Sequence, residues 1–287
     1  MALNMNHKCI KNNVILTDEI IDTLKNEKIT HLIIQDSNKL SNENILLQKI
    51  PSFINKITIY SGKYNTLAYI NPHINEIILN IHSNSSSQIF DYIPYTIKNI
   101  NIYKDYICSN EYIINKLPPL MNSITIWPFT CEPNCTYNIN NLPVLLCKLT
   151  IKYIFNFSNI KNIPQIKELY ISGYIPNDWK NKINLSILSS GLTIIGFTNY
   201  DGDFINNISP NIETIVISSF AFKYLMAYNI NAIKYLNKLK NIYISCVEPN
   251  SSISKDIMTE YFNDKINIHL LTNNEINAIF NISIWFY

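Results

Sequence analysis

Aliphatic residues recur along the chain in a fixed order: one aliphatic, two residues of any type, a second aliphatic, one further residue and a third aliphatic. The clear copies are Ile29-Leu32-Ile34, Ile54-Ile57-Ile59, Ile74-Ile77-Leu79, Ile97-Ile100-Ile102, Met121-Ile124-Ile126, Leu146-Leu149-Ile151, Ile166-Leu169-Ile171, Ile212-Ile215-Ile217 and Leu239-Ile242-Ile244. Weaker copies are Ser189-Leu192-Ile194, Asn263-Ile266-Ile268 and Ile279-Ile282-Ile284. Alternation of apolar and other residues at the end of each copy is typical of a strand with one buried face.

The spacing of the copies and the position of proline support a repeat. From Ile29 to Asn263, successive copies begin 20 to 27 residues apart. Eight of the 12 prolines lie two or three residues before the first aliphatic residue of a copy: Pro51, Pro72, Pro94, Pro118, Pro119, Pro143, Pro164 and Pro210. Proline is tolerated just before a strand because it cannot donate to the ladder inside it. Since one short strand cannot bury its apolar face alone, we expect stacked copies to form one parallel sheet.

The segment Leu142-Pro143-x-x-Leu146-x-x-Leu149-x-Ile151 resembles the LPxxLxxLxL unit of short leucine-rich repeats. The resemblance implies a repeat solenoid: a horseshoe with a parallel β-sheet on its concave face and irregular or short helical segments on its convex face. Residues 157–164 and 204–208 are similar to FNIP repeats, and the Ile- and Asn-rich style is similar to leucine-rich-repeat gene families of insect poxviruses. One departure is that Trp127, Pro128 and Phe129 follow a strand where the family usually has Asn.

The domain organisation predicted from this repeat has three parts. Residues 1–28 form an N-terminal cap helix, 29–270 form about eleven leucine-rich repeats, and 271–287 form a C-terminal cap. Solenoid ends need caps because their core would otherwise be exposed. Thr17 followed by two acidic residues indicates an N-capped helix.

Two further helices and the chain's end complete this prediction. Residues 222–239 and a segment from Ser254 are predicted helices, the first on the convex side. The apolar residues 282–287 are predicted to pack as part of the cap; the alternative is that they meet a partner or a second copy.

Composition and charge favour some partners over others. Charged residues make up 15% of the chain, the formal net charge is +2, and the 23 basic residues are all Lys. A phosphate-binding surface would show clustered basic residues, with Arg preferred, so we expect no nucleic-acid partner. No stretch reaches the roughly 18 apolar residues of a membrane span, and residues 1–20 lack the apolar core of a signal peptide. The six Cys are interpreted as reduced thiols of a cytoplasmic protein, in the host-cell cytoplasm if the protein is viral.

No group of residues has the spacing of a catalytic or metal site. The five His show no metal-binding spacing, and the pair Cys131 and Cys135 lacks two further ligands nearby. The five Gly are too few for a phosphate loop, and the pair Asp201 and Asp203 around Gly202 is typical of a solvated turn. The sequence therefore predicts a chain that is not an enzyme and has neither a metal nor a cofactor.

Strand residues between the core positions point to the opposite face, which the resemblance identifies as concave. Five of them are the predicted binding residues: Tyr60, Tyr103, Trp127, Lys152 and Tyr170. Tyr and Trp are enriched at interaction hot spots because they offer large, rigid contact areas, although 19 Tyr residues also suit strands simply as strand formers. The predicted function is a non-enzymatic protein-interaction module, with a viral protein that binds a host factor as the specific form. The alternatives are a structural, self-associating repeat protein and the substrate-recognition subunit of a ubiquitin-ligase-type complex.

Overall fold

The computed structural model describes residues 7–11, 16–35, 49–61, 70–81, 92–104, 112–114, 117–128, 137–139, 141–152, 155–156, 165–172, 191–198, 208–228, 231, 233, 235–245 and 266–280. The chain divides into two compact units. Unit 1 comprises Met1–Leu146 with Ile160–Asn162, and unit 2 comprises Cys147–Asn159 with Ile163–Tyr287.

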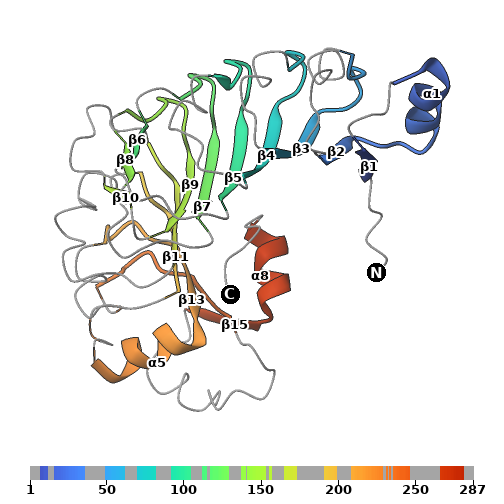
Figure 1. Cartoon of the computed structure of the whole chain (residues 1–287). Helices are drawn as coiled ribbons and strands as arrows, with labels where there is room; N and C mark the ends of the chain where they lie inside the picture. Colours follow the sequence, from blue (N-terminus) through green and yellow to red (C-terminus); the bar gives the residue numbers. More distant parts are fainter. Residues whose placement is uncertain are drawn as a thin grey trace. The chain divides into compact units, whose positions relative to one another are not determined.

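Unit 1 is built on parallel strands that follow one another in chain order (Figure 1). They are β1 (His7–Lys11), β2 (His31–Gln35), β3 (Lys56–Ser61), β4 (Glu76–Ile81), β5 (Asn99–Lys104) and β7 (Ser123–Pro128). Two short strands, β6 (Tyr112–Ile114) and β8 (Tyr137–Ile139), pair in parallel separately from these. Helix α1 (Asp18–Asn26) lies between β1 and β2 in the chain.

Unit 2 repeats the same arrangement with six more parallel strands among its described residues. They are β9 (Lys148–Lys152), β11 (Glu168–Ser172), β12 (Ile194–Phe197), β13 (Thr214–Ser218), β14 (Asn241–Ser245) and β15 (Asn267–Leu271). The unit also contains β10 (Phe155–Asn156), helix α5 (Ser219–Tyr228) directly after β13, and helix α8 (Asn273–Phe280) directly after β15. The repeat solenoid of parallel strands expected from the sequence is therefore present.

Among the described residues, seven repeats use the same backbone turn before their strand. The amide of the first aliphatic residue donates to the carbonyl oxygen three residues earlier, as in Ile54 to Pro51 and Leu146 to Pro143, both at 3.0 Å. One carbonyl oxygen then accepts two amides from the next repeat: Asn55 accepts from Asn75 at 3.1 Å and from Glu76 at 3.2 Å. Proline fits this turn because only its carbonyl oxygen is needed there. The regular position of proline thus has a backbone cause.

The core confirms the aliphatic pattern. In all nine clear copies the three aliphatic side chains are buried, and Ile124 and Leu149 are both 0% exposed. In neighbouring strands the second and third aliphatic residues of the copies are in register, as in Leu149 beside Leu169 and Ile151 beside Ile171. Each copy thus contributes one layer to an apolar core, as a solenoid requires.

The weaker copies were assigned incorrectly. The prediction made Leu192 and Ile194 the second and third core positions of the copy that begins at Ser189, but the register pairs Ile195 with Leu169 and Phe197 with Ile171. The core positions of this repeat are therefore Leu192, Ile195 and Phe197, all 0% exposed. A pattern restricted to aliphatic residues misses this repeat because its third core side chain is aromatic.

The last two copies also differ from the prediction. In β15 the register pairs Ile268 with Ile242 and Leu270 with Ile244, two residues away from the predicted positions. Ile279, predicted to start a final strand, lies in helix α8. The residues from 281 onward, which include the rest of that copy, and the helix predicted from Ser254 lie outside the described residues.

The predicted helix starting after Thr17 is confirmed as α1. Thr17 is its N-cap, and its hydroxyl oxygen accepts from the amide of Ile20 at 3.4 Å. Strand β1, which pairs in parallel with β2, was not predicted within residues 1–28. The helix predicted from Phe222 is α5; it begins at Ser219 and buries Ala221, Phe222 and Leu225.

Candidate functional site

Helix α8 begins with a side-chain cap that the local sequence encodes. Thr272 precedes its first residue, and the Glu275 amide donates to the Thr272 hydroxyl at 3.3 Å. In return, the Glu275 carboxylate accepts from the Thr272 amide at 2.8 Å and from its hydroxyl at 2.9 Å. This reciprocal pair is a capping box, which satisfies amides that a helix start leaves without partners. The chain therefore turns straight from β15 into α8.

Helix α8 covers the outward face of strands β11 to β14 in unit 2; we name this surface the α8-covered face (Figure 1). Ile276 of the helix, Tyr170 of β11 and Val216 of β13 form one cluster, each 0% exposed. Tyr243 and Phe280 are partly buried against the same cluster. These strand residues share a face because register pairs Tyr170 with Gly196, Gly196 with Val216, and Val216 with Tyr243.

Aromatic rings hold the C-terminal end of the helix. The Phe280 ring centroid lies 4.9 Å from that of Tyr243, edge to face, and 6.2 Å from that of Tyr170. The His269 ring stacks on the Tyr243 ring, with 4.4 Å between the ring centroids and 11° between the ring planes. Ile276 and Phe280 are four residues apart and so lie on one side of the helix. That side faces the sheet, whereas Ile279 is 56% exposed.

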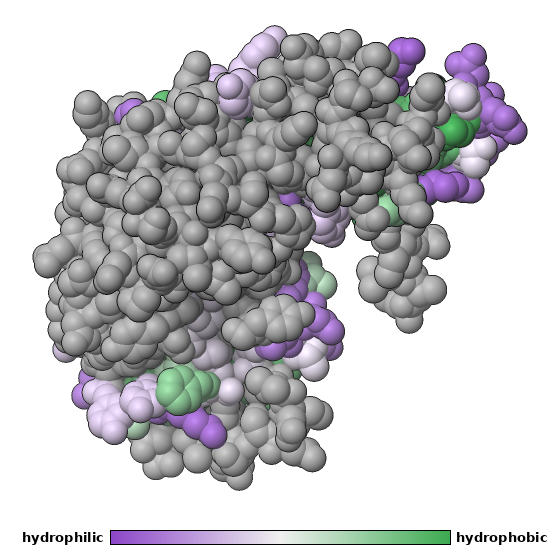
Figure 2. Space-filling view, viewed as in Figure 1, coloured by the Kyte–Doolittle hydropathy of each residue, from purple (hydrophilic) through white to green (hydrophobic). Residues whose placement is uncertain are grey.

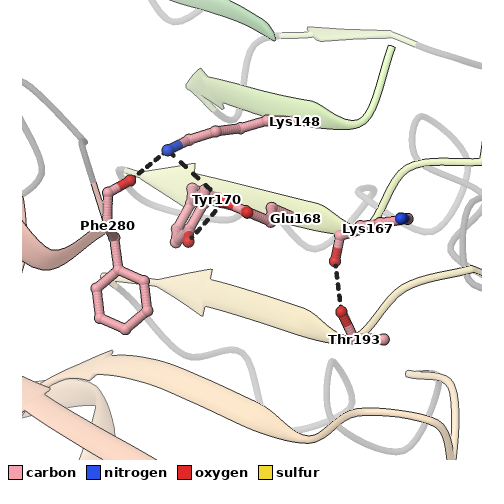
Figure 3. A network of polar contacts seen from close by, with 6 residues as sticks. All are labelled: Lys148, Lys167, Glu168, Tyr170, Thr193 and Phe280. Atoms are coloured by element: carbon pink, nitrogen blue, oxygen red, sulfur yellow. Dashed lines mark hydrogen bonds and ion pairs between the residues drawn. The ribbon is translucent and has the colours of Figure 1, made fainter. Parts of the chain in front are cut away.

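Polar contacts fix both ends of α8 to the strands, and Figure 3 shows those at its C-terminal end. The Lys148 ammonium donates to the carbonyl oxygen of Phe280, in the last turn of the helix. The same Nζ lies 3.6 Å from Oε2 of Glu168 and 5.3 Å from the Tyr170 ring centroid. At the other end, the Ser245 hydroxyl donates to the side-chain oxygen of Asn273. A cation at a helix C-terminus is favourable because the last carbonyl groups carry partial negative charge.

Burial sets the protonation of this network. Desolvation lowers the pKa of Lys148, although the carboxylate of Glu168 acts in the opposite direction. Burial, reinforced by Glu168, raises the pKa of Tyr170 strongly, so its hydroxyl stays protonated and donates to Glu168 at 3.2 Å. Burial also raises the pKa of the neighbouring Cys147 thiol. The Tyr170 hydroxyl therefore keeps its hydrogen bond to Glu168 within β11, and the bond that reaches the helix is the one from Lys148 to Phe280.

The five predicted binding residues have different surroundings. Tyr60 on β3 is half-buried, but Tyr103 on β5 is 5% exposed and Tyr170 on β11 is 0% exposed. Exposure of the last two was expected and is corrected: Tyr170 lies under α8, and Tyr103 lies on an interior strand with a register neighbour on each side, Asn80 and Trp127. Strands pack about 4.8 Å apart, so an outward ring on an interior strand lies close to the side chain of its register neighbour, here Asn80 on β4.

Register brings some of the predicted residues together. Tyr103 and Trp127 occupy paired positions on β5 and β7, as predicted. Lys152 ends β9 and pairs with Ser172. The side chains of Trp127 and Lys152 lie outside the described part of the structure.

The outward face of β3 to β5 in unit 1, which we name the β3–β5 face, carries mostly uncharged side chains. Tyr60, Ile78, Asn80 and Asn101 there are all half-buried. At the starts of β3 and β4, Lys56 and Glu76 form an ion pair of 2.6 Å. A face of this composition offers apolar contact and amide hydrogen bonds but little net charge.

Helix α5 exposes an aromatic row. Phe220, Tyr224 and Tyr228 are 59%, 44% and 76% exposed, and neighbouring rings lie 4.9 Å and 5.6 Å apart. Figure 2 shows a hydrophobic side chain beside weakly hydrophilic ones over this helix. Phe222, the first residue of the helix predicted over residues 222–239, is buried.

The described residues contain no group of three or more His, Cys, Asp or Glu side chains placed to hold a metal ion. Within the same part of the chain, no helix combines the length and apolar character needed to cross a membrane. The predicted pairs at Cys131 and Cys135 and at Asp201 and Asp203 lie outside the described residues.

Sequence reasoning missed Glu168, which lies beside the α8-covered face, and Ile276 and Phe280 of α8, which pack on that face. A local signal for the helix was present, since Thr272-Asn-Asn-Glu275 fits a capping box. The aliphatic pattern competes with this signal, because Ile279 also fits the first position of a weak copy. No local signal indicates that this helix lies on the outward face.

Comparison with known protein families, with curated proteins and with solved structures finds no match to this chain.

Proposed function

We propose that this chain is a non-enzymatic protein-interaction module of the leucine-rich-repeat horseshoe class, and that it binds its partner through outward strand faces. The observation that carries the proposal is the β3–β5 face, where Tyr60, Ile78, Asn80 and Asn101 stand on three adjacent strands in register. Parallel strands about 4.8 Å apart place these side chains in one continuous surface. Aromatic, aliphatic and amide groups in such a surface are suited to a protein partner.

The supporting argument is that the repeat assigns separate tasks to the two strand faces. The aliphatic positions are used in the core, as with Ile57, Ile77 and Ile100 at 0% exposure. The outward positions are therefore free to vary without loss of the core. A viral protein that binds a host factor is the specific form of the proposal, and its small net charge of +2 disfavours an anionic partner such as nucleic acid.

Affinity capture with matched variants tests this function. Full-length protein, Tyr60→Ala and Tyr95→Ala are used as bait in extract from cells that make the chain, and captured proteins are quantified by mass spectrometry. Tyr95 is the control because it is 69% exposed in the turn before β5, away from the face. We expect one protein to be captured equally by wild type and Tyr95→Ala, and about tenfold less by Tyr60→Ala, as for a hot-spot residue. Equal capture by all three baits would contradict the proposed face.

A further inference from the structure

Helix α8 is held on the strands of unit 2 at both of its ends and along one side. Lys148 binds the carbonyl of Phe280, Ser245 binds Asn273, and Ile276 is enclosed with Tyr170 and Val216. Its eight residues span about 12 Å at 1.5 Å each. The strands that carry the two end contacts, β9 with Lys148 and β14 with Ser245, are four strand spacings apart, about 19 Å. The helix therefore covers the strands between them, and the long side chain of Lys148 reaches its last carbonyl group.

The contacts use features common to many helices. The α8-covered face contacts three kinds of group on the helix. These are an apolar pair four residues apart (Ile276 and Phe280), the last backbone carbonyl, and one polar side chain in the first turn. Any amphipathic helix with an apolar pair at this spacing presents the same groups. The residues of α8 that point away, such as Ile279, do not take part.

Helix α8 is also suited to be replaced. A helix of eight residues is too short to be stable alone in water, so it persists only through its docking contacts and its cap. Among its described side chains, Ile276 alone is fully buried. A longer partner helix that is already formed before binding would offer the same contacts without the cost of ordering a short helix.

From these observations we infer that the α8-covered face is a binding site for an amphipathic helix of a partner protein, and that α8 is its intramolecular occupant. The inference rests on the proposed interaction function and specifies the partner's binding element. Partner binding at this face then requires displacement of α8, which competes from within the same chain. The competition makes binding at this face conditional, because an intramolecular segment acts at a high effective concentration.

The test is a titration monitored by fluorescence anisotropy with a fluorescein-labelled peptide of residues 271–283. The full-length proteins are wild type, Ile276→Asp, which displaces α8, and Ile279→Asp, which places the same change on the exposed side of the helix. We expect the peptide to bind Ile276→Asp at least tenfold more tightly than wild type, whereas Ile279→Asp behaves as wild type. Glu275→Ala, which removes the cap but no buried group, is the second way to loosen α8 and should also strengthen peptide binding.

Two controls establish that the peptide occupies the α8-covered face through its apolar pair and its terminal carbonyl. A peptide with Ser in place of Ile276 and Phe280 should not bind, and Lys148→Met added to Ile276→Asp should weaken binding several-fold. A second peptide that keeps only the Ile and Phe pair in an Ala- and Gln-rich helix should bind within tenfold of the first.

Three results would overturn the inference. The first is equal peptide affinity for wild type, Ile276→Asp and Glu275→Ala, and the second is binding unaffected by Lys148→Met. The third is a wild-type dimer in light scattering that Ile276→Asp abolishes, since this would assign the face to α8 of a second copy. Peptide binding is independent of the Tyr60→Ala capture experiment, so failure of the helix site and failure of the interaction function are distinguishable.

Discussion

Lys148 donates a hydrogen bond from its ammonium to the backbone carbonyl of Phe280, which lies 132 residues later in the chain. The bond joins the first residue of β9 to the last residue of α8. It lies beside Glu168 and above the ring of Tyr170, so a cation, a carboxylate and a phenol are concentrated at one end of the helix. This contact explains why Tyr170, an outward residue of its strand, is buried.

The first prediction concerns this contact. Lys148→Met keeps the aliphatic stem but removes the charged donor, which typically contributes about 1.5–3 kcal/mol when it is hydrogen-bonded. We expect hydrogen exchange of the α8 amides to become about tenfold faster or more, because 1.4 kcal/mol corresponds to a factor of ten. Exchange of the β13 amides should be little changed.

Lys240→Met is the matched control for this change. Lys240 and Glu213 form an ion pair of 2.7 Å with 62% and 40% side-chain exposure. Exposed pairs contribute little because water screens them, so α8 exchange should stay at the wild-type rate. Equal effects of the two substitutions would show that Lys148 does not hold the helix.

The second prediction distinguishes the two registers of β12. Ile195 is 0% exposed, whereas its neighbour Ile194 is half-buried on the outward side. Ile195→Ala should reduce the free energy of unfolding by about 2–5 kcal/mol through lost burial and a cavity. Ile194→Ala should cost about 1 kcal/mol, an ordinary value for a partly buried site. Urea unfolding of the two variants measures the difference, and the reverse order would restore the register predicted from the aliphatic pattern.

The third prediction concerns the core at β9. Leu149 is 0% exposed, and Leu145, in the preceding turn, is 56% exposed. Leu149→Asp places an unpaired carboxylate among apolar side chains, which costs several kcal/mol. We expect loss of the cooperative thermal transition followed by circular dichroism. Leu145→Asp should melt within a few degrees of wild type, since surface changes are usually within about 0.5 kcal/mol. A soluble, cooperatively melting Leu149→Asp protein would be incompatible with this core.

The fourth prediction is a pH dependence of the α8 cap. Hydrogen bonds from Thr272 lower the pKa of Glu275 below its ordinary value of 4.5. A carboxyl group with a lowered pKa in the folded protein stabilises it above the ordinary value, and this stabilisation is lost as the pH falls through the lowered pKa. We therefore expect the start of α8 to loosen below about pH 4.5, as followed by NMR shifts of its amides and of the Glu275 carboxyl carbon.

Glu275→Gln is the control for the cap. Glutamine can occupy the same position of a capping box but does not titrate. The α8 amide shifts in this variant should stay flat between about pH 5 and pH 3, where wild type changes. A Glu275 carboxyl that titrates at its ordinary value in wild type would show that the cap does not form.

Much of the fold could be predicted from local order in the sequence. Strands such as β3 and β9 follow from alternating aliphatic residues, and the turns follow from prolines whose carbonyl oxygens accept the next strand's first core amide. Helix α1 follows from Thr17 as an N-cap. The prediction was wrong at β12 because Phe197 takes a position filled by an aliphatic residue elsewhere, while Gly196 supplies no outward side chain.

The sequence by itself determined the repeat, the strands of its clear copies and which of their residues face the core. These depend on periods of two residues and on short-range hydrogen bonds, and both can be recognised locally. Only the tertiary structure decided which outward residues are covered. Tyr170 and Tyr60 both occupy outward positions of their strands. Tyr170 is nevertheless enclosed by Ile276, whereas Tyr60 is half-buried. Alternation specifies the direction in which a side chain points, whereas its burial depends on a helix encoded more than a hundred residues later.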